Sequence, residues 1–563
     1  MSLMTCRDAV RARIRHALPV LAVSLLACAC SRGADLVVVR GMVWTGLASG
    51  PAWPGGVAIR GDSIVAVGDS SAVAPYIGRG TRVIDAHGGL IMPGFNDAHT
   101  HFIDASLALS SVQLRDAATP QEFVRRIAAY DRGLKPGEWI TGGEWDHTLW
   151  PGQTLPRHEW IDSVTPNTPV VVERLDGHEL LANAMAMRLA GITASTPTPF
   201  GGQILHDPAT GQPTGVFKDA AQDLIYRVVP NATAEQMDSA LARGLAHAES
   251  LGVTGVGYMS ASFADLESFR RMERAGRLTM RCVLYILEDW RATADTLKAE
   301  GAGDDWVRIG GMKRFMDGSA GSRTAFMAQP YADSAGYRGL LEHTPADMAR
   351  WIGAADSAGL QVAIHSIGDS ANALLLAMYD SVARAHGPRD RRFRVEHAQH
   401  LRPQDIPKFG ADSFIASMQP YHAIDDGRWI EQRLGPQRIH NAYVFRSLLD
   451  SHAVLAFGSD WPVAPLDPIV GVYAAVTRRT LDGKNPDGWI PEQKITLAEA
   501  LRAYTWGNAY AVFAEHRRGT LAPGMLADVD VLDHDLFIMP PESLATARVA
   551  ETIVGGKVVF ERR

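Results

Sequence analysis

Apolar runs alternate with helical patterns through most of this chain. The helical patterns lie between the runs, for example over residues 234–250, 345–358 and 372–386. This alternation is typical of a parallel sheet, and eight strand-plus-helix units predict a TIM-type (β/α)8 barrel over residues 91–514 of an α/β protein. The eight expected strands are 90–96, 252–259, 280–287, 309–316, 361–365, 393–397, 414–418 and 454–459.

One long segment, at about residues 102–231, interrupts this alternation after the first strand. It contains an apolar strand pattern at 169–173 and many glycine and aromatic residues. Because it follows a barrel strand, we expect this insertion to emerge at the C-terminal mouth of the barrel, where active sites of this fold form.

The two ends of the remaining chain share a different pattern of short, β-branched, turn-punctuated segments. These segments lie at 34–44, 56–67 and 81–84, and again at 527–532 and 549–560. We expect residues 31–90 and 515–563 to build one small β-sandwich together.

Residues 1–30 have the pattern of a signal peptide. Basic residues precede an apolar stretch at 17–27 that is too short to span a membrane, which needs about 20 residues. The sequence Leu25-Leu26-Ala27-Cys28 resembles a lipobox, which would make Cys28 (or Cys30, on a shifted alignment) a lipidated N-terminus. We expect an exported protein of the bacterial periplasm or an outer-membrane lipoprotein, with simple secretory cleavage as the alternative.

Composition and charge favour an enzyme that acts on small molecules. The 563 residues are 46% hydrophobic and carry a net charge of −7 without long runs of one sign. This balance gives no electrostatic footprint for nucleic acid, and membrane contact is expected only through the N-terminal lipid. The sequence leaves the oligomeric state open, a homodimer included.

Candidate metal ligands fall at the ends of five predicted strands. About 0.6 His-X-His pairs are expected by chance in a chain with 19 histidines, so His99-Thr100-His101 alone has little force. Its context is stronger, because the C-terminal ends of parallel barrel strands meet at one mouth. The further candidates at strand ends are Lys313, His365, His397 and Asp460.

These motifs resemble the amidohydrolase superfamily of metal-dependent hydrolases, and within it the amidohydrolase-3 or YtcJ-like branch. The resemblance covers most of residues 35–563 and rests on the sequences at 93–101, 313–319, 365–369, 395–399 and 458–460. It implies one or two divalent metal ions, expected to be zinc, held by His99, His101, His365, His397 and Asp460. Lys313 would bridge two ions if carboxylated, since a plain ammonium cannot ligate.

The resemblance also implies a mechanism. A zinc-like ion lowers the pKa of bound water to about 7, and Asp460 would act as the catalytic base. We expect hydrolysis of a non-peptide C–N bond, of the amide or N-formyl type. The alternatives are a mononuclear deaminase of a heterocycle and a non-catalytic surface lipoprotein.

Substrate selection is expected from the insertion and the barrel loops. The candidates are Trp145, His147, Asp176 and His178, for which packing is the alternative role. Arg323 is a further candidate, because a guanidinium can bind a carboxylate through two hydrogen bonds or form a structural ion pair.

Overall fold

The computed structural model describes residues 33–47, 50–287 and 289–563. The predicted signal peptide and the two lipidation candidates, Cys28 and Cys30, lie outside these residues. Among the helices described, none combines the length and the apolar content that a membrane span requires.

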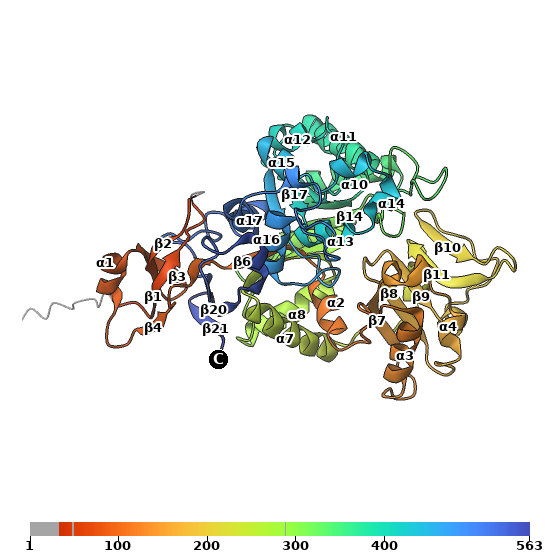
Figure 1. Cartoon of the computed structure of the whole chain (residues 1–563), viewed down its shortest axis with the longest axis horizontal. Helices are drawn as coiled ribbons and strands as arrows, with labels where there is room; N and C mark the ends of the chain where they lie inside the picture. The colour runs from red at the N-terminus through yellow and green to blue at the C-terminus, as the bar shows by residue number, and fades with distance from the viewer. Residues whose placement is uncertain (1–32, 48–49, 288) are drawn as a thin grey trace, which may run out of the picture.

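Eight parallel strands form a nearly closed barrel, consistent with the predicted TIM-type architecture (Figure 1). Neighbouring strands pair in chain order from first to last. The last strand reaches the first through the segment that follows it, where the Asp460 amide donates to the His99 carbonyl at 2.7 Å and the His101 amide to the Trp461 carbonyl at 2.8 Å. The strands are β6 (Phe95–Thr100), β12 (Val253–Ala261), β13 (Arg281–Leu287), β14 (Val307–Phe315), β15 (Gln361–Ser366), β16 (Arg394–His397), β17 (Ile415–Met418) and β18 (Val454–Phe457).

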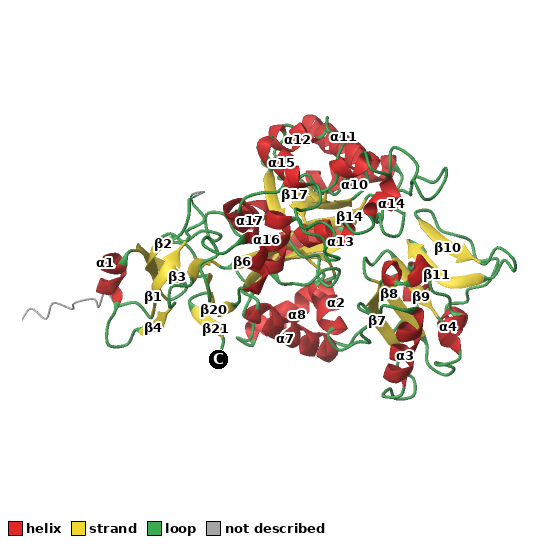
Figure 2. Cartoon of the chain, in the orientation of Figure 1, coloured by secondary structure: helices red, strands yellow, loops and turns green. Residues whose placement is uncertain are grey.

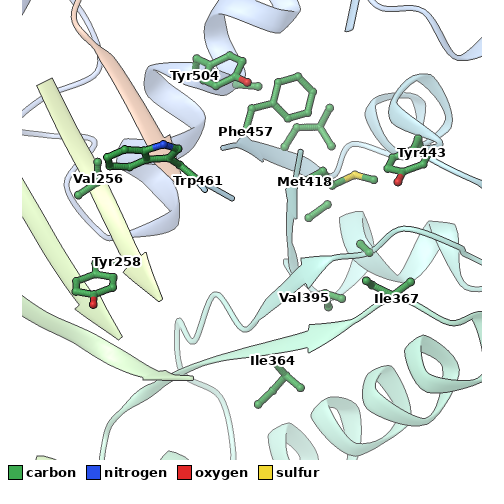
Figure 3. Close-up of a cluster of buried hydrophobic side chains, with 14 of the residues drawn as sticks. Val256, Tyr258, Ile364, Ile367, Val395, Met418, Tyr443, Phe457, Trp461 and Tyr504 are labelled. Carbon is green, nitrogen blue, oxygen red and sulfur yellow. The ribbon is translucent and has the colours of Figure 1, made fainter. Parts of the chain in front are cut away.

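The barrel strands are buried on both faces, as expected for parallel strands covered by helices. Side chains from several strands pack into one core, in which Phe457 and Tyr504 meet edge to face (Figure 3). Helices surround the barrel strands (Figure 2). Some of them begin at a capping box, as those after Thr233 and Ser262 do. The helices after β12 include α8 (Phe263–Arg274), α9 (Trp290–Glu300), α10 (Pro345–Ser357), α11 (Asp369–His386), α12 (Ile406–Ala411), α13 (Pro420–Asp426), α14 (Ile430–Leu434), α15 (Phe445–Asp450), α16 (Pro468–Thr477), α17 (Leu497–Tyr504) and α18 (Trp506–Ala511).

The segment between β6 and β12 folds around a separate five-stranded sheet with the order β10-β11-β9-β8-β7. Two clusters of buried apolar side chains cover this sheet, and the unit lies at the opposite side of the barrel from the N-terminal strands (Figure 1). Its elements and connecting helices are α2 (Phe102–Ala108), α3 (Pro120–Asp131), β7 (Ile140–Trp145), α4 (Glu159–Asp162), β8 (Val170–Arg174), β9 (Glu179–Ala182), α5 (Ala184–Leu189), β10 (Gly202–His206), β11 (Pro213–Asp219), α6 (Asp223–Tyr226) and α7 (Ala234–Ser250).

Strands from both chain ends join in one sheet with the order β21-β20-β19-β5-β1-β2-β3, with β4 beside β1. One apolar cluster contains side chains from both ends. The finer expectation, a two-layered sandwich, stays a prediction. The elements are β1 (Leu36–Val43), β2 (Trp53–Arg60), β3 (Ser63–Gly68), α1 (Ser70–Val73), β4 (Arg82–Asp85), β5 (Leu90–Pro93), β19 (Val529–Leu532), β20 (Val549–Val554) and β21 (Lys557–Glu561).

The predicted strand 90–96 is two strands in the structure. β5 (Leu90–Pro93) belongs to the terminal sheet, where it pairs with β1 and β19, and β6 (Phe95–Thr100) begins the barrel. Gly94 separates them, and an added Cβ there would lie 2.3 Å from the Thr254 side chain. As a result, His99 lies within the first barrel strand and not beyond its end.

Candidate functional site

A cavity of about 1160 Å³ lies between the mouth of the barrel and the insertion. Five of the six predicted metal ligands line it, namely His101, Lys313, His365, His397 and Asp460. His99, the sixth, is completely buried beside them. The six residues lie on β6, β14, β15 and β16 or directly after β6 and β18, and these strands end at the same mouth.

Asp460 is the centre of this group. Its Oδ1 atom lies 3.4 Å from Nε2 of His99 and 3.3 Å from Nε2 of His101. Its Oδ2 atom lies 3.9 Å from Nδ1 of His397. Burial raises the pKa of the carboxyl group, but His99 and His101 outweigh burial and hold that pKa at about 2. Asp460 is therefore a carboxylate at neutral pH.

A second aspartate fixes the two chain segments that carry His99 and Asp460. The Asp97 carboxylate accepts hydrogen bonds from the backbone amides of His99 and Ser459, each at 3.0 Å. Asp460 itself has a φ of 65°, a left-handed conformation that a non-glycine residue adopts at a cost of about 1–3 kcal/mol. The surrounding contacts thus impose the backbone at this position.

His365 and His397 leave the ends of adjacent strands with their rings 4.5 Å apart. Nδ1 of His397 donates to Oε1 of Gln419 at 2.8 Å, while Nε2 of His365 faces the Gly318 carbonyl at 3.3 Å. Burial is the main reason that the pKa values of His99, His365 and His397 lie well below the ordinary value. Neutral imidazole is the form that ligates metals.

Lys313 is completely buried beside these histidines. Its Nζ lies 3.4 Å from Nε2 of His99 and 4.6 Å from the centre of the Phe315 ring. Burial lowers the pKa of this lysine to about 8. The amine therefore lies next to His99, so that a carboxylated Lys313 would lie beside the histidines.

The donor set fits a divalent metal ion. Ligand atoms of His99, His397 and Asp460 all lie within 4.8 Å of one another. Oδ1 of Asp460 is buried and receives no hydrogen bond within the described ranges, which is costly for a carboxylate without a cation. Imidazole nitrogen and carboxylate oxygen together are ligands that suit zinc.

The five predicted substrate residues separate into two groups. Asp176 and His178 line the cavity. Nδ1 of His178 lies 2.7 Å from Oδ1 of Asp219. His178, Asp219 and Glu342 also form a second group of residues that could hold a cation. The short Nδ1–Oδ1 distance is that of a direct hydrogen bond.

The other three residues do not line the cavity, and substrate contact by them stays a prediction. Trp145 is packed in the core of the insertion, where Nε1 donates to the Val172 carbonyl at 3.0 Å. His147 is buried and accepts from Arg174 at 3.4 Å. Arg323 forms an ion pair with Asp333 at 2.8 Å.

Three further residues at the site were not predicted. Nε2 of His422 lies 3.9 Å from Oδ2 of Asp460, and its ring stacks at 6.3 Å on that of His397. Glu396 accepts from Nδ1 of His99, and Asp219 binds His178. The signal for His422 was its place four residues after the seventh strand, where the same strand-end argument applies.

Comparison with known proteins shows the family of this chain. The model of the amidohydrolase family matches residues 82–560. The putative amidohydrolase YtcJ of Bacillus subtilis is 30% identical over 488 residues, which cover 86% of this chain and 91% of that protein. The N-substituted formamide deformylase of Arthrobacter pascens is 29% identical over 528 residues, covering 90% and 95% of the two chains.

Two more similarities extend over nearly the whole chain. Protein LONG AFTER FAR-RED 3 of Arabidopsis thaliana is 37% identical over 540 residues, which cover 94% of this chain and 92% of that protein. The crystal structure of an uncharacterized metal-dependent hydrolase from Pyrococcus horikoshii superposes with a TM-score of 0.72 at 28% identity, covering 90% of this chain and 99% of that one. The chain therefore belongs to the amidohydrolase family, in its YtcJ-like branch.

Proposed function

We propose that this protein is a metal-dependent hydrolase that cleaves a non-peptide C–N bond, of the amide or N-formyl type. The observation that carries the proposal is the buried Asp460 carboxylate, whose Oδ1 faces Nε2 of both His99 and His101 beside a large cavity. The relative from Arthrobacter pascens, named an N-substituted formamide deformylase, supports the choice of bond.

The proposed metal ligands are His99, His101, His365, His397 and Asp460, with zinc as the expected ion. The ion, when bound, lowers the pKa of a coordinated water and polarises a carbonyl group. We also propose that carboxylated Lys313 takes part in a binuclear site. Its Nζ lies 3.4 Å from Nε2 of His99, and the donor atoms are already in place around it.

The residues of the chain move the protons and hold the substrate. Asp460, an anion at neutral pH, accepts the proton of the attacking water and passes it to the leaving nitrogen. Asp176 and His178 are proposed to contact the substrate from the insertion side of the cavity.

Export remains a proposal that rests on residues 1–30 alone. The same holds for attachment through Cys28 or Cys30. The oligomeric state stays open, a homodimer included. Mass spectrometry of the mature N-terminus would separate lipidation at Cys28 or Cys30 from simple cleavage.

The test combines metal analysis with a substrate panel. Protein purified without chelator is analysed for bound metals and assayed on N-substituted formamides, acetamides, esters and amino-heterocycles, with separate detection of released amine, carboxylate and ammonia. We expect at least one equivalent of metal and release of amine with formate or another carboxylate. Ammonia release from a heterocycle with one bound ion would support the deaminase instead. A protein with neither metal nor turnover would support the non-catalytic alternative.

A further inference from the structure

The insertion places one histidine beside the metal ligands of the barrel. His178 lies between β8 and β9, and its ring is 4.9 Å from that of His365, the ligand candidate on β15. His178 lines the same cavity as Lys313, His365, His397 and Asp460. A residue 77 positions from His101 in the sequence therefore lies beside the ligand candidates at the mouth of the barrel.

The orientation of this ring is fixed from one side. Nδ1 of His178 is bound to Oδ1 of Asp219 at 2.7 Å, and the Asp219 side chain is completely buried. The backbone amide of Asp219 also donates to the His178 carbonyl at 3.1 Å. Nε2 makes no hydrogen bond within the part of the chain that the structure describes, and the ring is 11% exposed. Nε2 is therefore the ring nitrogen left for a molecule in the cavity.

The loop after β14 holds this part of the insertion against the barrel. The Thr324 hydroxyl donates to Oδ1 of Asp219 at 3.3 Å, and the Ser322 hydroxyl to Oδ2 of Asp176 at 3.0 Å. Gly318 allows close approach, since a Cβ there would lie 2.5 Å from Oδ1 of Asp219. The same Gly318 offers its carbonyl to His365 at 3.3 Å. The loop after β14 therefore helps to position both His178 and the ligand candidate His365.

We propose that His178 is a catalytic residue that hydrogen-bonds the acyl oxygen of the substrate through Nε2, with Asp219 as its positioning residue. This inference rests on the proposed hydrolysis of an amide. When water attacks the carbonyl carbon, a C–O bond forms and the carbonyl π electrons move to oxygen. On collapse the C=O bond re-forms, the C–N bond breaks, and the leaving nitrogen takes the proton that Asp460 accepted. A donor at the acyl oxygen stabilises the charge that develops there.

Nδ1 of His178 donates to the buried Asp219 carboxylate, so an N–H at Nε2 belongs to the imidazolium, the charged form that this 2.7 Å ion pair stabilises. In this arrangement the barrel and the insertion have different roles in the reaction. The barrel supplies the metal ligands and the base, and the insertion supplies the contact to the acyl oxygen.

The first test uses three variants and a matched control. Loss of an oxyanion donor lowers kcat by about 100- to 1000-fold, so we expect a loss of this size for His178→Ala, with little change in KM. His178→Gln, which keeps an N–H near the position of Nε2, should recover at least about 10-fold of that loss, and Asp219→Asn should fall between the two. The control is His158→Gln, because His158 forms the same 2.7 Å contact with Asp162 in the insertion but does not line the cavity. It should keep wild-type kcat.

The outcomes against the inference are specific. Unchanged kcat in His178→Ala, or a rise in KM alone, would overturn it, because a contact that binds the ground state and the transition state equally leaves kcat intact when it is removed. Loss of one metal equivalent in His178→Ala would overturn it too and would assign His178, Asp219 and Glu342 to a cation. Thermal unfolding of each variant reports whether the fold is kept, and His178→Gln gives the answer if His178→Ala does not fold.

A second measurement does not need turnover. Methylphosphonate, a tetrahedral anion, is titrated calorimetrically into the zinc-loaded wild type and the His178 variants. We expect binding to weaken at least about 10-fold in His178→Ala and less in His178→Gln. Equal affinity in all variants would contradict the inference. If the wild type binds methylphosphonate in this way but hydrolyses no amide, the proposed function fails and the contact from His178 stands.

Discussion

Glu396 accepts a hydrogen bond from Nδ1 of His99 at 2.7 Å, with both side chains completely buried. The same carboxylate binds Nε of Arg394 at 2.7 Å and the Ser417 hydroxyl at 2.6 Å. Arg394 also donates to the Ala98 carbonyl at 2.8 Å, next to His99. This network fixes the hydrogen of the His99 ring on Nδ1, so that Nε2 is free to ligate and faces Asp460.

Replacing Glu396 with Gln should therefore weaken metal binding. The side-chain amide of Gln has one accepting oxygen, whereas both carboxylate oxygens of Glu396 accept hydrogen bonds. We expect a loss of about 10- to 100-fold in zinc affinity, the usual effect of losing the hydrogen-bond partner of a ligating histidine. Competition with a chelating dye measures this directly. Glu515→Gln is the control, because Glu515 binds Arg392 at 2.8 Å away from the cavity. Equal zinc affinity in Glu396→Gln and wild type would show that the hydrogen bond does not tune the site.

Asp460→Asn should abolish most activity. The amide can neither accept the proton from water nor supply a charged ligand, and general-base catalysis alone contributes about 100- to 10,000-fold. Steady-state rates on the best formamide or amide substrate, together with metal content, separate the two effects. Rates that fall while the metal is retained would identify the proton transfer. Wild-type rates in this variant would rule out Asp460 as the base.

The barrel and the convergence of the ligand candidates could be predicted because they follow from local pattern and topology. Each barrel strand is a short apolar run, and parallel strands bring His101, Lys313, His365 and His397 to one mouth whatever the loops do. The ends of the strands could be predicted less exactly than their order. Leu90 and Phe95 lie in one continuous apolar run, so only pairing shows that they belong to different sheets.

The insertion could not be predicted to the same depth, because its residues act through contacts between distant positions. Trp145 and Asp176 both lie next to polar residues at or after a strand of the insertion, yet Trp145 is packed in a core and Asp176 faces the cavity. Asp219 is 41 residues from His178, and no local pattern connects them. Tertiary packing decides which of such residues meet a substrate.

Gly458→Ala should displace the strand that carries His99 and so weaken the metal site. An added Cβ would lie 2.5 Å from Oδ1 of Asp97 and 2.6 Å from the backbone nitrogen of His99, so the strand that carries His99 must shift. We expect a loss of about 1–3 kcal/mol in the free energy of unfolding and weaker zinc binding, measured by urea denaturation and dye competition. Gly80→Ala is the matched control, because nothing lies within 4 Å of its added Cβ. If both variants behave alike, the contact of Gly458 with the strand is not limiting.

Asp426→Asn should change how stability depends on pH. Oδ2 of Asp426 accepts from Nε2 of Gln399 at 2.6 Å and from the Tyr443 hydroxyl, and burial raises the pKa of Asp426 to about 8. The unfolded chain releases this proton near the ordinary value of 3.8, whereas the folded protein keeps it until about pH 8. The folded state binds more protons between these values, so the contribution of Asp426 to stability falls as pH rises through this window.

The neutral amide of Asp426→Asn lacks this titration. Urea denaturation of both proteins at pH 5, 6.5 and 8 should therefore show the variant gaining stability relative to wild type as pH rises. A difference between the two proteins that stays constant over this range would contradict a raised pKa at Asp426. Since Asp426 lines the cavity, a confirmed trend would also mean that this wall presents a neutral carboxylic acid, able to donate a hydrogen bond to a substrate, at neutral pH.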